Sequence, residues 1–359
     1  MSTRYRLIGT SDLDAPLLEA WRKTQASDPC FQSPYFSPEF TLAVASVRSN
    51  VRVVLIEQDN QPVGFFPHER NRWGTGRPVG GPMSDYHGVL MRPNIEWSLA
   101  SLMKAADLST WAFDHLVISD DRFTPHLRAR STSPQMDLSA GYDQYVKDRR
   151  EAGSDYIPKT EALTRKLVRE MGELHFAFHD SSAETLALLL KWKSAQYVGA
   201  GLTDLFEVPW TGGLLNRIAT TQNENFAGVC SVLRVGDRPV AAHIGMRSNT
   251  SLHYWFPAYD PCFTKFSVGI ALLLRIAREA AASGLTRIDL GKGDSQYKQR
   301  LMSCAVPLGE GIVRTPSLCG VLSRARQTAE DWNSRGVFGL ALRLPLKAVR
   351  RIERARRLR

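Results

Sequence analysis

Three strand-like segments in the second half of the chain constrain the fold most strongly. They cover residues 226–235, 238–247 and 251–260. The short stretches between them, residues 236–237 and 248–250, contain the Gly or Asn residues typical of tight turns. The pattern therefore predicts three consecutive antiparallel strands.

A helical segment follows these strands. Residues 267–284 end at Gly284, which suits a left-handed cap at the helix C-terminus. A strand-like segment, 286–292, and a short helix, 295–302, come next. This order predicts one α/β unit for the second half of the chain.

The first half also alternates strands and helices. It contains a hairpin, with strands at 51–57 and 63–70 and turn residues at 59–62. The other expected strands cover residues 4–8, 115–119 and 175–179. The expected helices cover residues 15–26, 95–107, 158–174, 183–196 and 210–221, and one further helix ends near residue 47.

The two halves share a sequence pattern. Residues 55–67 (LIEQDNQPVGFFP) parallel residues 233–245 (LRVGDRPVAAHIG), with Pro62 and Pro239 at matching places. A duplicated α/β unit explains this similarity, whereas chance is the alternative because the turn chemistry is common.

The length of the chain sets the expected number of domains. At about 150 residues per domain, 359 residues predict two domains. We expect an N-terminal domain at 1–150, a connecting helix and strand at 151–182, a C-terminal domain at 183–320, and a basic helical tail at 321–359.

Hydropathy and cysteine usage indicate a cytoplasmic protein. The N-terminus lacks the apolar run of a signal peptide, and no stretch reaches the roughly 18 apolar residues of a membrane span. The five cysteines show no C-x-x-C spacing, which predicts neither a zinc site nor a disulfide framework.

The net charge of +10 is concentrated at the C-terminus. Residues 343–359 contain eight Lys or Arg residues against one acid, Glu353. Leu342, Leu346, Val349 and Ile352 recur near helical spacing, as in a basic amphipathic helix lying on anionic lipid. A solvated terminal helix is the alternative, and the lack of aromatic residues in this tail argues against nucleic-acid binding.

Three long segments carry a resemblance to a known family: residues 191–210, 241–274 and 288–301. They resemble the CelD/BcsL family of GNAT-type acetyltransferases of cellulose and exopolysaccharide biosynthesis, which is itself similar to the FemAB-like tandem GNAT fold. The resemblance implies an α/β (α+β) fold of two tandem GNAT-like domains, with mixed, mainly antiparallel sheets flanked by helices. It covers residues 155–315 closely and the first half loosely, through SDYHG at 84–88.

In such a fold the fourth strand separates from the fifth, and the exposed backbone binds the pantetheine arm of the donor and polarises its thioester. The resemblance places these strands at 253–258 and 287–290. Trp255 and Phe256 are then expected to bind the donor and Tyr254 the substrate. Neighbouring strand residues face opposite sides, so one of Tyr254 and Trp255 is expected in the core.

The donor diphosphate is expected at the start of helix 267–284, where free N–H groups attract an anion. Lys265, Ser267 and Gly269 are the residues expected to bind it, although Ser267 could simply be an N-cap. Phe266 stands where the family motif usually has Arg or Gln. This departure leaves open a different thioester or an aminoacyl ester as the donor.

The segment IDLGKGDSQYKQRL is the densest polar cluster after an apolar strand. The resemblance implies that Tyr297 protonates the departing thiolate as a general acid. Asp289 and Asp294 are candidates for orienting the acceptor, and Asp294 could instead cap the short helix. Lys292 and Lys298 are candidates for phosphate binding.

The general base is not identified by the sequence. His243, Asp85 and His87 are the candidates, although a lone strand histidine such as His243 often only packs. Ser84, Asp85, Tyr86 and His87 are expected to line the acceptor site. No histidine spacing indicates a metal: His175 and His179 lie four apart in a strand-like segment.

Taken together, these features predict an enzyme that moves an acetyl or other acyl group from acyl-CoA to an amine or hydroxyl of a sugar-derived, polysaccharide or envelope precursor. Acyl-CoA is expected as a co-substrate, with no tightly bound cofactor, and the basic tail is compatible with peripheral inner-membrane contact. Two alternatives remain: a FemAB-like transferase that uses aminoacyl-tRNA, and a catalytically silent subunit of a polysaccharide synthase.

Overall fold

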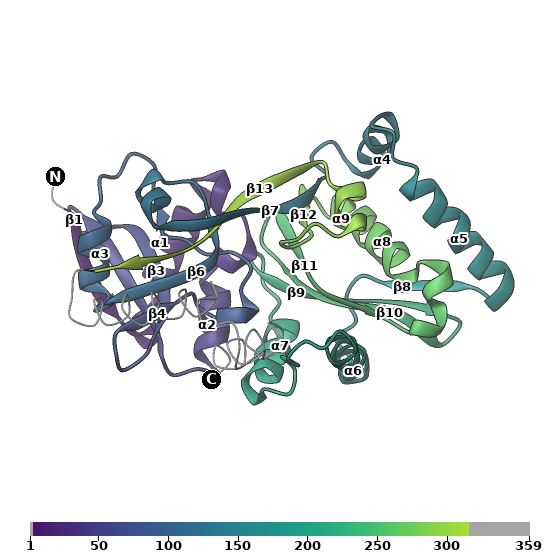
Figure 1. The fold of residues 1–359 in the computed structure, drawn as a ribbon, viewed down its shortest axis with the longest axis horizontal. Coiled ribbons are helices and arrows are strands. Elements are labelled where there is room, and N and C mark those ends of the chain that lie inside the picture. The colour runs from purple at the N-terminus through teal and green to yellow at the C-terminus, as the bar shows by residue number, and fades with distance from the viewer. Residues whose placement is uncertain (1–2, 316–359) are drawn as a thin grey trace, which may run out of the picture. The chain divides into compact units, whose positions relative to one another are not determined.

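The computed structural model describes residues 3–315 (Figure 1). They form two compact units, each assembled from separate stretches of the chain. The first unit contains residues 3–27, 48–129 and 309–315, and the second contains residues 28–47 and 130–308. The boundaries expected from the sequence were contiguous and differ from this division. The basic tail predicted at 321–359 lies outside the described residues.

The first unit is built on the antiparallel hairpin of β2 (Val51–Gln58) and β3 (Gln61–Arg70). β1 pairs with β2, β4 and β5 pair with β3, and β6 pairs in parallel with β4. The bounds of these strands are Thr3–Ile8 for β1, Thr75–Arg77 for β4, Leu90–Met91 for β5 and Thr110–Val117 for β6. Helix α1 (Ala15–Ala26) packs on β3, and α3 (Leu99–Ala105) packs on β1.

The second unit contains a sheet in the order β7-β12-β11-β10-β9-β8. β8 to β11 pair antiparallel, whereas β11 and β12 pair in parallel. The bounds are Leu127–Asp137 for β7, Leu174–Ala177 for β8, Ala227–Val235 for β9, Arg238–Arg247 for β10, Ser251–Tyr259 for β11 and Arg287–Asp289 for β12. β7 and β13 (Cys304–Arg314) each have residues in both units.

Helices cover both sides of this sheet in the second unit, with α8 and α5 on one side and α6 and α7 on the other (Figure 1). The bounds are Pro38–Ala45 for α2, Tyr142–Glu151 for α4, Tyr156–Met171 for α5, Ala183–Gly199 for α6, Pro209–Thr220 for α7, Val268–Ala282 for α8 and Gln296–Leu301 for α9. None of the helices described between residues 3 and 315 has the length and apolar character needed to span a bilayer.

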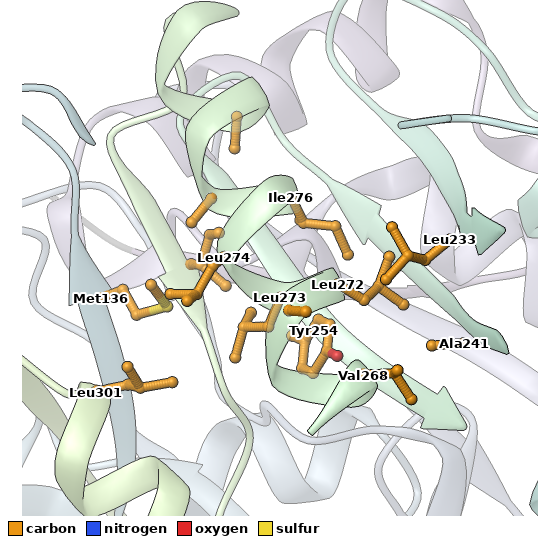
Figure 2. Packing of buried hydrophobic residues seen from close by; sticks show 14 of the residues in the cluster. Met136, Leu233, Ala241, Tyr254, Val268, Leu272, Leu273, Leu274, Ile276 and Leu301 are labelled. Atoms are coloured by element: carbon orange, nitrogen blue, oxygen red, sulfur yellow. The ribbon is translucent and has the colours of Figure 1, made fainter. Parts of the chain in front are cut away.

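Helix α8 supplies much of the core of the second unit (Figure 2). Leu272, Leu273 and Ile276 are fully buried against side chains of the sheet, such as Leu233 and Tyr254. Each buried side chain of this size contributes roughly 1.5–3 kcal/mol to folding. The core therefore fixes α8, and with it the first turn of this helix, relative to β11.

The repeated sequence pattern has a structural counterpart. In the first hairpin, Glu57 pairs with Pro62 and the register then shifts, so that Val63 is the extra residue of a bulge. In the second hairpin the register shifts in the same way after Pro239, and Val240 is the extra residue. Two bulges at matching positions favour duplication over chance similarity.

Most elements predicted from the sequence are present, with shifted ends. The helix predicted at 95–107 is shorter, because Ser98 accepts a hydrogen bond from the Ser101 N–H and starts α3 at Leu99. The strand predicted at 115–119 instead begins at Thr110, as part of β6. The elements missing from the prediction are β4, β5, β7, α4 and β13.

Alanine substitutions at two glycines would test how α7 packs on β9. A Cβ atom at Gly228 would lie 2.1 Å from the Ile218 carbonyl oxygen, whereas one at Gly212 would meet nothing within 4 Å. We expect Gly228→Ala to lower the free energy of unfolding by about 3 kcal/mol. Gly212→Ala should raise it by up to about 1 kcal/mol, because alanine favours the helix. Urea unfolding of both variants checks this, and wild-type stability of Gly228→Ala would contradict the packing described.

Candidate active site

The candidate site lies where β11 and β12 stop pairing. Ser251, Leu252 and His253 pair with β12, whose last residue is Asp289. β11 continues to Tyr259 beyond this last pair. The two strands therefore separate after His253, and residues 254–259 of β11 have no pairing partner in β12.

A lysine from α6 lies at the separated part of β11. Lys193 Nζ donates a hydrogen bond to the Pro257 carbonyl oxygen at 2.9 Å. Burial, with a smaller contribution from the nearby Lys298 charge, lowers the pKa of Lys193 to about 8. In the sequence Lys193 is one of two lysines in the segment KWK of this helix, and no local pattern distinguishes it.

Two predicted donor-binding side chains lie together on β11. Trp255 and Phe256 stack with ring centroids 4.7 Å apart, and both are largely buried. The register of β11 against β10 is irregular between Ile244 and Met246, opposite this point. Phe206 packs edge-on against Phe256 at 5.2 Å, so the chain segment before α7 also lines this part of the strand.

Of Tyr254 and Trp255, one of which was expected in the core, Tyr254 is the residue that belongs to the core cluster. It belongs to the apolar cluster beneath α8, and its hydroxyl points at the Gly269 carbonyl oxygen at 3.5 Å. Burial raises the pKa of Tyr254 well above its usual value. These contacts describe a packing residue, so a role in substrate binding has no support from its surroundings.

His243 stacks on Tyr254 with ring centroids 4.4 Å apart. It is fully buried, and neither ring nitrogen has a hydrogen-bond partner among the described residues. Burial lowers the pKa of His243 to about 3. The environment therefore opposes the proton uptake that a general base requires.

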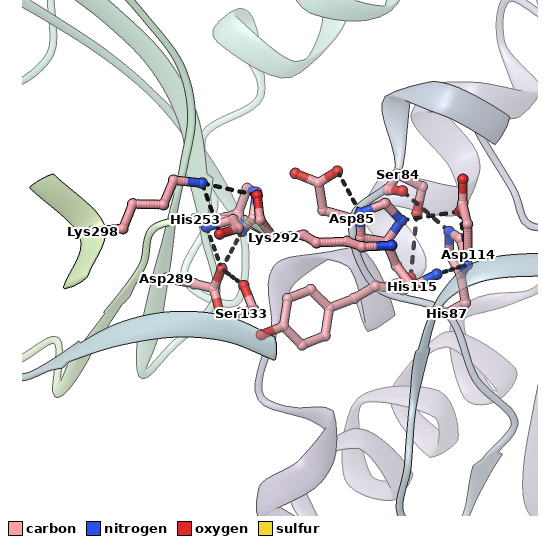
Figure 3. A network of polar contacts seen from close by, with 12 residues as sticks. Ser84, Asp85, His87, Asp114, His115, Ser133, His253, Asp289, Lys292 and Lys298 are labelled. Atoms are coloured by element: carbon pink, nitrogen blue, oxygen red, sulfur yellow. Dashed lines mark hydrogen bonds and ion pairs between the residues drawn. The ribbon is translucent and has the colours of Figure 1, made fainter. Parts of the chain in front are cut away.

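Asp289 is the centre of a buried polar network (Figure 3). Ser133 Oγ and Gln135 Nε2 on β7 donate to its two carboxylate oxygens at 2.7 and 2.8 Å. The Gly291 N–H donates at 2.8 Å, and His253 Nδ1 lies 3.2 Å from Oδ1. Such partners are what a buried carboxylate needs, and they fix the end of β12 and the loop that follows.

The loop after β12 is closed by Lys298. Its Nζ donates to the carbonyl oxygens of Gly291 and Lys292 at 2.8 and 3.0 Å (Figure 3). Lys298, which the sequence predicted to bind phosphate, therefore makes its hydrogen bonds to the backbone of the loop after β12. Asp294 is exposed, and Ser295 rather than Asp294 occupies the N-cap position of α9.

Tyr297 on α9 is half-buried and packs against the core of the second unit. Burial raises the pKa of Tyr297 to about 12. The phenol is therefore protonated at neutral pH, as a general acid must be.

The first turn of α8 has the features expected of an anion site. Ser267 occupies the N-cap position in a left-handed conformation, with φ of 54°, and its side chain makes no capping hydrogen bond. Ser267 is therefore the N-cap residue that the sequence allowed, without a side-chain capping hydrogen bond. Lys265 is exposed beside this turn, 3.7 Å from Glu170, whereas Phe266 is buried in the core.

The segment Ser84–His87 of the first unit is also ordered by hydrogen bonds. Ser84 Oγ donates to the Tyr86 carbonyl oxygen at 3.2 Å. His87 is buried, which lowers its pKa to about 4. His115 and Asp114 of β6 lie beside this segment, and sequence reasoning missed both because they are far from it in the chain.

Comparisons with known proteins agree with this geometry. Residues 161–299 match the model of a family described as acetyltransferase (GNAT) domain. No curated protein matches. The matched segment contains α6, β9 to β12 and most of α9, and therefore the separated strands.

Several solved structures have a similar fold. FemX has a TM-score of 0.58 at 8% identity, covering 87% of this chain and 96% of that one. The C-terminal domain of a putative lysylphosphatidylglycerol synthetase from Agrobacterium fabrum has a TM-score of 0.51 at 12% identity, covering 87% and 96%. A conserved protein of unknown function from Bacteroides thetaiotaomicron has a TM-score of 0.51 at 11% identity, covering 85% of this chain and 98% of that one.

These likenesses show the fold alone. The predicted fold class, α/β (α+β) with GNAT-like units, is confirmed, and the family match supports a GNAT-type acyltransferase. The finer resemblance to the CelD/BcsL family is not confirmed by these comparisons and stays a prediction.

Lys193 makes a testable contribution to the pH dependence of stability. The pKa of Lys193 is about 8 in the folded chain, whereas an ordinary lysine has a pKa of 10.5. Between these two pH values Lys193 is therefore protonated in the unfolded chain and mostly deprotonated in the folded chain. Stability therefore rises with pH across this window. Relative to Lys193→Met, the wild-type free energy of unfolding should increase by up to about 3 kcal/mol between pH 8 and 10.5. Urea unfolding at pH 7.5 and 10 checks this, and parallel profiles would contradict the lowered pKa.

Proposed function

We propose that this protein transfers an acetyl or other acyl group from acyl-CoA to an amine or hydroxyl of a sugar-derived, polysaccharide or envelope precursor. The separation of β11 from β12 inside the GNAT-matched segment carries the proposal. It leaves a stretch of strand backbone available beside buried aromatic side chains. A pantetheine arm can pair with such backbone as an added strand would.

The donor thioester would lie along residues 254–258 of β11. Trp255 and Phe256 would line its path, and a backbone N–H of the strand would polarise the thioester carbonyl. N–H donors aimed at a developing oxyanion contribute about 3 to 4 kcal/mol to transition-state stabilisation. Lys193, which donates a hydrogen bond to the Pro257 carbonyl oxygen, would keep this stretch of strand in position.

The diphosphate of acyl-CoA would lie at the first turn of α8. Lys265, Ser267 and Gly269 lie at this turn, and the Ser267 side chain makes no capping hydrogen bond that would compete with a ligand for the first N–H groups. Acyl-CoA is then a co-substrate that binds and leaves in each cycle. Lys292 would add positive charge from the loop after β12.

The reaction would be direct attack of the acceptor on the thioester. The tetrahedral intermediate would collapse with release of the thiolate, and Tyr297 would deliver its phenolic proton to the leaving sulfur. Asp289 would act through His253 and the loop after β12, which it orders, rather than by touching the reacting atoms. Exposed Asp294 would orient the acceptor.

The acceptor class rests on the family resemblance. Ser84, Asp85, Tyr86 and His87 of the first unit are the residues proposed to bind the acceptor, with Asp85 as the accessible candidate for the general base. Location in the cytoplasm, with peripheral contact to the inner membrane through the basic tail, belongs to the same proposal.

One observation favours a second candidate, an aminoacyl-ester donor as in FemAB-like transferases. Phe266 occupies the place of the usual Arg or Gln in the diphosphate motif, and its ring is buried in the core with the Lys265 ammonium 4.6 Å above it. The diphosphate site thus has one cation fewer than the family motif supplies.

Calorimetric titration with acetyl-CoA and longer acyl-CoAs separates these candidates. Lys265→Ala should weaken acyl-CoA binding about five- to tenfold, through loss of one charge-assisted contact. Lys166→Ala is the matched control, because Lys166 also lies 3.7 Å from Glu170 but belongs to α5. Absence of binding to any acyl-CoA would overturn the thioester donor and favour the aminoacyl ester.

Removal of the proposed acid should slow the chemistry without affecting binding. We expect Tyr297→Phe to lower kcat about 100-fold in a thiol-release assay with a panel of amino sugars, and to leave the Kd for acyl-CoA unchanged. Tyr156→Phe removes a nearby half-buried phenol and should keep wild-type kcat. Equal rates for the two variants would contradict the role of Tyr297.

A further inference from the structure

A second cluster of ionisable side chains lies in the first unit, outside the GNAT-matched segment. The segment 84–88 runs beside β6, and the backbone holds the two together. The His87 N–H donates to the His115 carbonyl oxygen at 2.9 Å, and the Val117 N–H donates to the His87 carbonyl oxygen at 3.0 Å. The side chains of His87, Asp114 and His115 are therefore placed by paired backbone.

The ligand atoms of these three side chains converge. Asp114 Oδ1 lies 3.0 Å from His115 Nδ1 and 3.7 Å from His87 Nδ1 (Figure 3). All three ligand atoms lie within 4.8 Å of one another. Bonds of about 2.0–2.2 Å to Zn²⁺ place tetrahedral ligand atoms about 3.3–3.6 Å apart. The separations of 3.0 and 3.7 Å lie on either side of this range, so small side-chain rotations would bring the ligand atoms to the spacing that Zn²⁺ requires.

The outer nitrogen of each imidazole faces an acceptor. His87 Nε2 lies 3.1 Å from the Ser84 carbonyl oxygen, and His115 Nε2 lies 3.7 Å from Asp85 Oδ1. Histidines that bind metals commonly donate their second N–H to a backbone carbonyl or a carboxylate, which fixes the ring and directs the other nitrogen at the ion.

The tautomer of His87 suits this arrangement. Its Nδ1 accepts the backbone N–H of His115 at 3.2 Å, so the ring proton is on Nε2 and the Nδ1 lone pair is the one near Asp114. A metal ion would compete with that N–H for the lone pair.

We propose that His87, Asp114 and His115 bind one divalent transition-metal ion of the Zn²⁺ class, with a water molecule in the fourth position. Two imidazoles and one carboxylate form the donor set that Zn²⁺ and Co²⁺ accept, whereas Mg²⁺ and Ca²⁺ require more oxygen ligands. The ion would fasten segment 84–88 to β6. The sequence predicted no metal because these ligands show no motif spacing.

The full-length protein, treated with a chelator and dialysed, can be titrated with ZnCl₂ by calorimetry and with Co²⁺ by visible absorption. We expect one ion per chain and the absorption of four-coordinate Co²⁺. Asp85→Asn, which leaves all three ligands intact, should weaken zinc binding about 10- to 100-fold. His115→Gln should abolish the Co²⁺ absorption.

The control is His175→Gln, which removes an exposed histidine beside Glu173 in the second unit and should leave zinc binding unchanged. Circular dichroism of each variant verifies that it is folded. Absence of zinc binding by the wild type at millimolar ZnCl₂ would overturn the proposal. So would an equal Kd for the folded wild type and His115→Gln.

Discussion

The candidate donor site depends on the point at which β12 stops pairing with β11. That point is fixed by the Asp289 carboxylate, which collects hydrogen bonds from Ser133 and Gln135 on β7 and from the Gly291 N–H. A buried carboxylate without such partners would cost several kcal/mol, so the strand end and the loop are held together. Because β12 ends there, the rest of β11 has no pairing partner in β12, and the proposed donor would pair with it.

The surrounding structure keeps the separated part of β11 in place. On one side of the sheet, α8 packs on Tyr254 and is fixed by a continuous apolar core. On the other side, α6 brings Lys193 to the Pro257 carbonyl oxygen. The ammonium is partly removed from water at this position, which is reflected in its lowered pKa. Packing and electrostatics therefore position one stretch of backbone from both sides.

Much of the fold could be predicted from the sequence, because hairpins and amphipathic helices have local signals. The turns around residues 59–62 and 236–237 placed both hairpins correctly. β7 and β13 were missed because their polar residues, Pro134, Pro307 and glycines resemble loops. In the site, the start of α8 could be predicted from the chain, whereas Tyr297 was assigned from the family resemblance and its role stays a prediction. Lys193 and the ligands of the proposed metal site could not, because their roles arise from contacts between distant segments.

The account is tested most directly by a crystal structure of the protein with acetyl-CoA. It predicts the pantetheine arm along residues 254–258 of β11, the thioester carbonyl at a backbone N–H of that strand, and the diphosphate at the first turn of α8. Acetyl-CoA bound elsewhere, or β11 and β12 paired along their whole length with no ligand between them, would contradict it.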